Sequence, residues 1–446
     1  MKFLLFWMGV AGTAWAQQPA GRSAGEYTID LFDNPVKIEK IAIPDFLVDV
    51  PGAEAAAAKD VMMRVIKADL GNAGFFEIID LGRFASLGNP HVGPIDFEEW
   101  GSVEADHLVI GALKDQDGQL RVEIRLYEIA TRRHILAKAY RGRPKLARKM
   151  AHVIADDIMF RLRNVKFATS KIIFARDSPS KRDPLITNKE LFLMDYDGEN
   201  SLPITRGGLS FAPAALRIGN DTRLVYCAFE KPDTLQADYN IYFKPTLLSR
   251  PKPLLAGTLK RASAPALSPD GKKVVFSMAV DGNVDLYLMN VDGSDFLRLT
   301  RHPGVDTNPS WSPGGNALLF TSDRIGSPQI YQMDADGLNK RRITTENPYN
   351  DSAVWNPVYN YIAYVSRFDN DFDIFIMDMR DGTNYRVTNR QGSNETPCWS
   401  PSGNQLCFAS NRTGQWQLYV VNLNGRNLRQ VTFSGNNRSP AWVAGD

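Results

Sequence analysis

The sequence predicts a six-bladed β-propeller preceded by a smaller α/β domain, and three regularities in the second half of the chain predict the propeller. Prolines recur there at a constant interval of 44 residues: Pro269, Pro313, Pro357 and Pro401. Threonines that each end a short apolar run keep the same interval: Thr300, Thr344, Thr388 and Thr432. Alternating apolar residues and Asp-Gly turns lie between these landmarks. Self-similarity at about 40–45 residues with such content is typical of propeller blades.

Each repeat contains the signals for four short strands. In the repeat from Pro309 to Thr344, residues 311–315 close the first strand, and Asp336 and Gly337 supply the hairpin turn before the last. The same order of signals fills three further units, at 265–300, 353–388 and 397–432. Two degraded units precede them, at 171–205 and 213–243, and an insertion at 232–253 enlarges the second.

The two ends of the repeat region predict how the propeller closes. The unit at 171–205 has no first strand of its own, whereas Pro440, Ala441 and Trp442 repeat the start of a blade with no blade behind them. We expect the C-terminal segment to complete the first blade, because this would remove the free edges of an open ring of sheets. The count is then six blades, in a propeller domain spanning 170–446.

Residues 17–165 lack the 44-residue repeat, and their pattern of apolar residues predicts a separate α/β domain. Helical spacing of apolar residues occurs at 53–70 and again after Pro144, whereas 41–46, 75–79, 107–113, 122–126 and 135–140 are strand-like. His152 lies on the second predicted helix without a ligand partner at a suitable spacing. The linker to the propeller is expected at about 164–170.

The first 16 residues predict a secretory signal. Lys2 precedes an apolar run at 3–10, and the small-residue motif ending at Ala16 precedes Gln17. No later segment contains about 18 uninterrupted apolar residues, so the mature chain is not expected to insert into a membrane. We therefore expect an exported protein that is cleaved near Ala16.

Composition and motifs argue against several classes of function. The formal net charge of +2 is too small to favour nucleic acid or anionic lipid as the main partner. Phosphate-binding loops, zinc-binding clusters and hydrolase nucleophile motifs are missing from the sequence, and its five histidines are scattered. We expect neither a catalytic residue nor a cofactor. The competing hypothesis is a secreted propeller that binds a small ligand or hydrolyses a peptide or glycan.

Cysteine usage leaves one question open. The sequence has three cysteines, and two of them, Cys398 and Cys407, lie on either side of a predicted turn at 401–403. They could face each other across adjacent strands and form a disulfide, or they could be buried thiols.

Polar residues recur just before the first strand of successive blades and predict a binding surface. Connections from the last strand of one blade to the first of the next emerge on one face around the central channel. The residues at these connections are Arg261, Ser263, Asp306, Thr307, Asn308, Asn350, Asp351, Ser352, Asn394, Glu395, Thr396, Asn437, Arg438 and Ser439. They could be solvated loop tips, but their recurrence favours a shared surface. Asp306, Asp351 and Glu395 form a secondary, weaker candidate for a calcium site.

Several segments resemble the TolB family of the Tol-Pal system. In the first domain the resemblance lies in the stretch at 68–76, Ala-Asp-Leu-Gly-Asn-Ala-Gly-Phe-Phe. In the propeller it lies in the segments at 268–272, 286–289, 298–300, 320–323 and 440–442. The resemblance covers almost the whole chain, and it is the combination of both domains that makes it specific.

This resemblance implies a monomeric, non-enzymatic adaptor of the periplasm. It implies binding of the lipoprotein Pal at the propeller mouth, at positions that include Arg261, Ala264, Asp306, Thr307 and Asn308. It implies binding of TolA by the mature N-terminus at about 17–31, with the residues Tyr27, Thr28, Ile29, Asp30 and Leu31. Other outer-membrane lipoproteins and colicins are further partners suggested by the family, whose role is to maintain outer-membrane integrity and support cell division.

Overall fold

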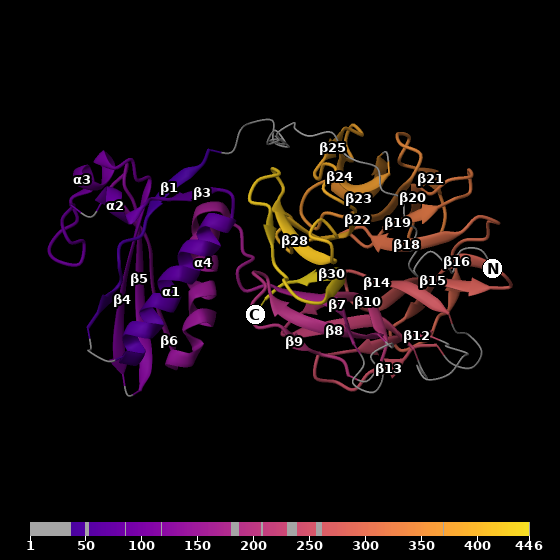
Figure 1. The fold of residues 1–446 in the computed structure, drawn as a ribbon, viewed down its shortest axis with the longest axis horizontal. Coiled ribbons are helices and arrows are strands. Elements are labelled where there is room, and N and C mark those ends of the chain that lie inside the picture. The colour runs from indigo at the N-terminus through magenta and orange to yellow at the C-terminus, as the bar shows by residue number, and fades with distance from the viewer. Residues whose placement is uncertain are drawn as a thin grey trace.

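The computed structural model describes residues 37–49, 53–84, 86–116, 118–179, 187–206, 208–229, 239–255, 261–368 and 370–445. The predicted signal peptide, the predicted TolA-binding residues 27–31 and part of the 232–253 insertion lie outside these residues. Figure 1 shows a mixed α/β domain beside a ring of sheets. The predicted fold class, an α/β domain followed by a six-bladed β-propeller, is confirmed.

The first domain is a mixed sheet with helices on both faces. Its strands are β1 (Glu39–Ala42), β2 (Leu47–Val48), β3 (Phe76–Ile78), β4 (His107–Gln116), β5 (Gln119–Glu128) and β6 (Arg133–Gly142). The sheet order is β3-β1-β4-β5-β6, and β2 pairs with β4 beyond the end of β1. Residues Val122, Ile124 and Leu126 alternate along β5 and are buried on one face. That face packs against the two long helices.

The two long helices are α1 (Ala53–Asn72) and α4 (Ala147–Arg163). A single 3-10 turn, Pro144–Leu146, precedes α4, so the proline opens the turn before the helix rather than the helix itself. Asn164 ends α4 in the left-handed region at a φ of 55°. The short helices α2 (Leu81–Phe84) and α3 (Phe97–Ser102) pack on the opposite face of the sheet.

Six four-stranded sheets form the propeller. Blade 1 contains β30 (Asn436–Val443), β7 (Lys171–Pro179), β8 (Thr187–Asp195) and β9 (Leu202–Pro203). Blade 2 contains β10 (Ser210–Ile218), β11 (Asp221–Phe229), β12 (Tyr239–Lys244) and β13 (Lys252–Pro253). Blade 3 contains β14 (Ala262–Leu267), β15 (Lys273–Val280), β16 (Asn283–Asn290) and β17 (Leu297–Arg298).

Blade 4 contains β18 (Asp306–Trp311), β19 (Ala317–Ser322), β20 (Gln329–Asp334) and β21 (Arg341–Arg342). Blade 5 contains β22 (Asn350–Trp355), β23 (Tyr361–Phe368), β24 (Asp371–Asp378) and β25 (Asn384–Arg386). Blade 6 contains β26 (Asn394–Trp399), β27 (Gln405–Ser410), β28 (Gln417–Asn422) and β29 (Arg429–Gln430). In every blade the strands are antiparallel neighbours in this order.

The C-terminal strand closes the ring as predicted. Strand β30 pairs antiparallel to β7, with Asn437 opposite Arg176 and Val443 opposite Lys171. The indole Nε1 of Trp442 also donates a 2.7 Å hydrogen bond to the hydroxyl of Ser170. The first blade is therefore built from both ends of the propeller sequence.

The threonines of the repeat have a common structural role. Each hydroxyl accepts a backbone hydrogen bond of 2.8–3.0 Å from the third strand of its own blade. Each also donates a bond of 2.6–3.1 Å to a side chain of that strand, namely Asp285, Gln329, Asp373 or Gln417. All of these groups are buried. Threonine recurs every 44 residues because one small hydroxyl both accepts and donates at this site.

The two cysteines around the predicted turn do face each other. Cys398 and Cys407 are paired in the register of β26 and β27. Both are free thiols in the structure, and Cys407 is fully buried.

Candidate partner-binding surface

The innermost strand of every blade begins at the same end of the propeller and carries the same irregularity. Its pairing with the second strand is interrupted by a register shift in all six blades. Within each shift one non-glycine residue has a positive φ of 48–55°: Ala212, Ala264, Asn308, Ser352, Thr396 and Ser439. Such a bulge bends a strand and changes the direction of its side chains. Six equivalent bulges thus encircle one opening, which we call the mouth.

Four residues predicted to face a partner are buried instead. Two positions before a bulge, the side chains of Asp306, Asn350, Asn394 and Asn437 are 0% exposed. The three asparagines donate hydrogen bonds of 2.8–3.1 Å to the third strand of the preceding blade, at Gln329, Asp373 and Gln417 respectively. The three asparagines therefore connect their blades to the preceding blade, and Asp306 pairs with Arg324 within its own blade. A partner contact by these four residues stays a prediction.

The residue directly before each bulge is half-buried at the mouth. We call this set the mouth ring: Phe211, Ser263, Thr307, Asp351, Glu395 and Arg438. Figure 1 shows innermost strands β10, β14, β18, β22 and β30 gathered about the centre of the propeller. Five members of the ring were predicted from the sequence. Phe211 was missed because it lies in the degraded second unit, although Ser-Phe-Ala-Pro at 210–213 matches the pattern of the other blades.

The charged members of the mouth ring lie on neighbouring blades. A guanidinium nitrogen of Arg438 is 4.0 Å from a carboxylate oxygen of Glu395, and its guanidinium carbon lies 3.9 Å from the centroid of the Trp416 ring. Burial raises the pKa of Glu395, and nearby Asp351 adds to the effect while Arg438 opposes it. Asp351 itself accepts hydrogen bonds of 2.8 Å from Asn308 and 2.7 Å from Thr321.

Arg261 lies at the edge of this surface. It is exposed, has a φ of 72°, and comes just before β14, the innermost strand of blade 3. On the same blade, the hydroxyl of Ser277 in β15 donates a 3.1 Å hydrogen bond to the hydroxyl of Thr307 on blade 4. The mouth therefore presents acidic and basic side chains, hydroxyl groups and the aromatic ring of Phe211.

The weaker calcium candidate is not supported. Both carboxylate oxygens of Asp306 accept hydrogen bonds from Arg324, at 2.9 and 3.1 Å. Within the described parts of the chain, Asp306, Asp351 and Glu395 do not form a group whose oxygens lie within 4.8 Å of one another. A guanidinium already neutralises the buried carboxylate, so the three oxygens do not form a cation cage.

The first domain packs on the face of the propeller opposite the mouth. Gln405 and Asn427 of blade 6 donate 3.0 Å hydrogen bonds to the backbone carbonyls of Asn72 and Gly71, at the end of α1. Gly74, with a φ of 78°, comes so close to Asn422 that a Cβ there would lie 2.4 Å from the amide nitrogen. The 68–76 stretch of the resemblance is therefore a domain contact.

A charged cluster is buried at the same boundary. The carboxylate of Asp69 on α1 accepts a 2.8 Å hydrogen bond from His152 on α4 and a 2.7 Å bond from the hydroxyl of Tyr196 in blade 1. Burial acts to lower the pKa of His152, but its hydrogen bond and charge interaction with Asp69 raise it overall. Arg148 bonds Asp197 beside the histidine, and Arg429 packs 5.5 Å from the Tyr196 ring centroid.

Asp69, His152 and Asp197 offer three potential metal ligands within 4.8 Å of one another. Both carboxylates are already engaged by cationic donors of the chain, namely His152 and Arg148. Two guanidinium groups next to the cluster also oppose a further cation. We therefore interpret the cluster as an ionic contact between domains, which sequence spacing could not reveal because 83 residues separate Asp69 from His152.

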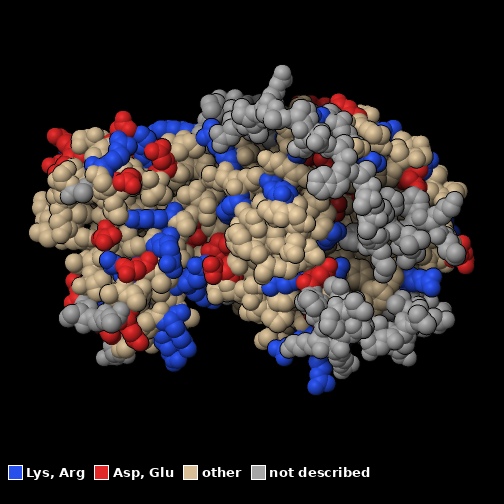
Figure 2. Space-filling view, viewed as in Figure 1, with Lys and Arg blue, Asp and Glu red and all other residues tan. Residues whose placement is uncertain are grey.

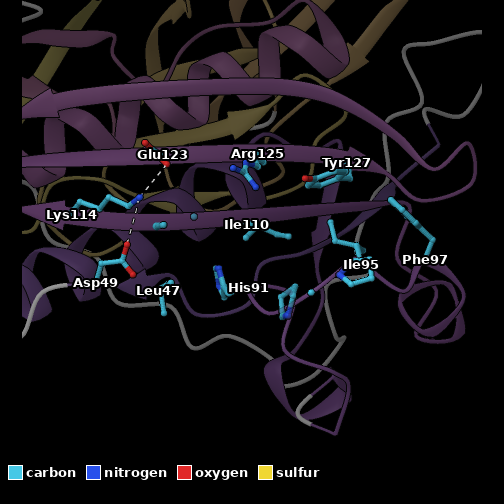
Figure 3. A pocket seen from close by; sticks show the side chains of 15 residues that line it. Leu47, Asp49, His91, Ile95, Phe97, Ile110, Lys114, Glu123, Arg125 and Tyr127 are labelled. Carbon is cyan, nitrogen blue, oxygen red and sulfur yellow. Dashed lines mark ion pairs between the residues drawn. The ribbon is translucent and has the colours of Figure 1, made fainter.

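A cavity of about 490 Å³ lies on the first domain, away from the propeller boundary. It is formed between β2, the β4-β5 face of the sheet and the segment at 90–97, and Figure 3 shows Arg125 and Tyr127 along one side of it. Its floor includes Ile110, and an ion pair at one end joins Lys114 to Asp49 at 3.6 Å. The sequence did not indicate this cavity.

Fold and surface together define a two-domain propeller protein whose repeated polar surface is its mouth. The model of the TolB beta propeller domain matches residues 164–374 and 365–446, and that of the TolB amino-terminal domain matches 27–135. The chain belongs to the TolB family. Members of this family are periplasmic, non-enzymatic components of the Tol-Pal system, and the chain is thus a Tol-Pal component.

Several solved structures are similar to this chain, and the first of them shows the same fold over both domains. TolB from Acinetobacter baumannii is 22% identical, with a TM-score of 0.76 over 93% of this chain and 97% of that one. Putative TolB from Agrobacterium tumefaciens is 18% identical over 60% of this chain and 91% of that one, with a TM-score of 0.47. Hydrazine synthase of Kuenenia stuttgartiensis is 14% identical over 61% of this chain and 46% of that one, with a TM-score of 0.51.

Among the residues the structure describes, no helix is both long enough and apolar enough to span a bilayer. Figure 2 shows basic and acidic side chains interspersed over the visible described surface, in agreement with the formal net charge of +2.

Proposed function

We propose that this protein is a periplasmic adaptor that binds Pal at the propeller mouth and TolA through its mature N-terminus. The observation that carries the proposal is the mouth ring, because six blades place equivalent, half-buried side chains around one opening. A central surface of this kind excludes water around its contacts, and such positions dominate the binding energy of protein interfaces. The predicted contact residues that are not fully buried at the mouth are Arg261, Ser263, Ala264, Thr307, Asn308, Asp351, Ser352, Glu395, Thr396, Arg438 and Ser439.

The Pal site is tested by calorimetric titration of residues 17–446 with the soluble domain of Pal from the same organism. We expect tight binding, and a loss of about a hundredfold in affinity when Thr307→Trp places a large side chain in the mouth. Thr383→Trp is the matched control, because Thr383 is exposed in a turn at the opposite end of blade 5. Equal losses in both variants would refute the site, and no binding by the intact chain would favour the small-ligand or hydrolase alternative.

The charge of Glu395 offers a finer test of the same surface. Replacement by Gln keeps the shape of the side chain but removes its interaction with Arg438. We expect the association rate with Pal to change and its salt dependence to weaken, because charges at an interface chiefly steer encounter. A rate and salt dependence identical to those of the parent would contradict a role for this charge in Pal binding.

The TolA site rests on the family alone, because residues 27–31 lie outside the described chain. We propose that cleavage near Ala16 exposes a segment, 17–31, that TolA binds, and that the domains span 17–165 and 170–446. Removal of residues 17–31 is expected to abolish TolA binding while Pal binding by the propeller persists. TolA binding that survives the deletion would refute the assignment, and N-terminal sequencing of the exported protein tests the cleavage position.

A further inference from the structure

We propose that the free edge of β6 in the first domain binds an extended acidic segment of another protein, which adds a strand to the sheet. This surface belongs neither to the propeller mouth nor to the mature N-terminus, so the proposal goes beyond Pal and TolA binding and depends on neither. Two separate observations carry it: an unpaired strand edge ten residues long and a run of basic residues along it. Figure 2 shows Lys and Arg side chains on the surface near the place where Figure 1 labels β6.

Strand β6 is the longer of the two edge strands of the sheet. The order β3-β1-β4-β5-β6 gives it one neighbour, β5, whereas β3 at the opposite edge has only three residues. Apart from β5, no described segment forms a backbone hydrogen bond with β6. The side chain of Arg161 donates a 2.8 Å hydrogen bond to the carbonyl of Ile135 near the start of the strand. Beyond that point the edge offers main-chain donors and acceptors to a strand added from outside.

The side chains on one face of β6 leave room for an added strand. Six of the ten residues of β6 are exposed, among them Ala137 and Ala139. These alanines are opposite Arg125 and Glu123 of β5 and therefore lie on the face turned away from the two long helices. Because an alanine side chain ends at Cβ, alternate side chains of an added strand can lie directly beside both residues.

The other face of the edge offers an apolar contact. Asp157 of α4 accepts hydrogen bonds of 2.6 Å from Lys138 and 2.7 Å from the hydroxyl of Tyr140, which fixes α4 beside β6. Phe160 lies one helical turn further along the same side of α4 and is 50% exposed. An apolar side chain of the added strand that covered Phe160 would be stabilised by removal of apolar area from water.

The charge along β6 specifies an acidic partner. Residues 129–155 contain eight Lys and Arg and no Asp or Glu, although the whole chain has a formal net charge of only +2. Within this run, Arg141, Arg143 and Lys145 lie at the end of β6 and just after it. All three are exposed and form no ion pair within 4.0 Å in the described parts of the chain. The end of the edge is therefore a cluster of three cations without a carboxylate partner there.

Two carboxylates flank the second half of β6, and both are already engaged. Arg121, opposite Arg141 in the sheet register, donates a 2.7 Å hydrogen bond to Glu123, and Asp157 is bonded to Lys138. Opposite charges on neighbouring strands stabilise a pair and like charges destabilise it, so the edge favours an acidic segment over a second copy of itself. An anionic membrane could neutralise the cations but would leave the strand edge unpaired.

The test uses the mature chain, residues 17–446, with labelled alanine methyl groups, so that Ala137 and Ala139 report on the edge by NMR. Fluorescence anisotropy measures the affinity of acetyl-Asp-Glu-Asp-Thr-Val-Thr-Val-amide and of the same sequence reversed, which suit antiparallel and parallel pairing respectively. One analogue replaces the acids by Asn-Gln-Asn, and another replaces both Thr by Pro, which keeps the charge but removes N–H donors. We expect one acidic peptide to bind at least about fivefold more tightly than either analogue, to shift both methyl signals and to weaken with salt.

Arg141→Gln combined with Arg143→Gln is expected to remove most of the preference for the acidic peptide over the neutral one. The matched control combines Arg250→Gln with Lys252→Gln, which are exposed cations of blade 2 outside the first domain. The side chains of Arg141 and Arg143 form no hydrogen bond among the described residues, so methyl signals elsewhere should stay unchanged and show that the variant is folded.

Equal affinity for the acidic peptides and the neutral analogue would overturn the proposal, as would equal affinity for the proline analogue. A preference that survives the double substitution at the edge would do the same. Phosphatidylglycerol vesicles that displace the peptide would assign the edge to an anionic surface, and sedimentation of the mature chain as a dimer would assign it to a second copy. Either result would overturn the assignment to another protein.

Discussion

The hydrogen bond from Tyr196 to Asp69 is expected to hold the two domains together. Its donor and acceptor are 2.7 Å apart, and the residues are 0% and 1% exposed, on opposite sides of the domain boundary. Tyr196→Phe removes only the hydroxyl and leaves a buried carboxylate with one donor fewer. Hydrogen bonds to charged groups contribute about 1.5–3 kcal/mol, so we expect a loss of about 2 kcal/mol in unfolding free energy. This corresponds to roughly a thirtyfold change in the equilibrium constant.

The measurement is urea unfolding of the mature chain, followed through the first transition, because an interdomain bond stabilises whichever domain unfolds first. Tyr226→Phe is the matched control. Tyr226 is a buried propeller tyrosine that stacks on Tyr242 with centroids 5.8 Å apart, and its hydroxyl has no hydrogen bond among the described residues. We expect the control to change the free energy of unfolding by less than about 0.5 kcal/mol. Equal effects of the two substitutions would refute the role assigned to the interdomain bond.

Three further predictions follow from buried groups. Arg324→Ala should lower the free energy of unfolding by about 3–5 kcal/mol, because it leaves the carboxylate of Asp306 buried without its partner. Urea unfolding at neutral pH measures this loss. A loss below about 1 kcal/mol would contradict the prediction. The pKa of His152 in the folded protein is raised above its ordinary 6.5. Its stabilising contribution should therefore be complete below about pH 6.5 and decline as the pH rises through this raised pKa. A His152→Gln variant whose stability had the same pH dependence as the parent would contradict this. Thiol titration in denaturant without reductant should give three reactive thiols. In the native protein, labelling of Cys407 should be slow because burial raises the pKa of its thiol. A single reactive thiol in denaturant would instead indicate a disulfide between Cys398 and Cys407.

The propeller could be predicted from the sequence because its recurring residues make the same contacts in each repeat. Thr300 and Thr344, for example, make the same pair of hydrogen bonds within their blades. Closure could be predicted because Pro440, Ala441 and Trp442 repeat the start of a blade. Repetition in the sequence therefore reports directly on repeated contacts.

The direction of individual side chains could not be predicted in the same way. The bulges decide which of two adjacent polar residues faces the mouth, so Asn394 is buried whereas Glu395 is half-buried. A strand without the bulge would follow simple alternation, but positive φ at Thr396 breaks that rule. Local strand geometry, which residue type alone does not specify, thus determines that Asp306, Asn350, Asn394 and Asn437 are buried while their C-terminal neighbours are not.

Contacts between distant segments also escaped prediction. The cavity of the first domain combines Leu47, His91 and Arg125, which only the sheet and the segment packed on it bring together. Arg125 lies on the polar side of the alternating strand β5, and alternation alone indicates solvent there. The charged cluster at Asp69 likewise requires two helices and a propeller turn to meet.

The two surfaces of the propeller meet in the same pair of blades. Glu395 of blade 6 and Arg438 of blade 1 face each other at the mouth, across the seam where the C-terminal strand closes the ring. At the opposite end of those blades, Gln405 and Tyr196 hold the first domain. A partner that changed the spacing of this seam would act on both ends, and the effect would be reciprocal because coupling between sites is a shared free energy. Interdomain substitutions such as Tyr196→Phe should therefore alter Pal affinity only if Pal binds two arrangements of the seam differently, and an unchanged affinity would show that the two ends act independently.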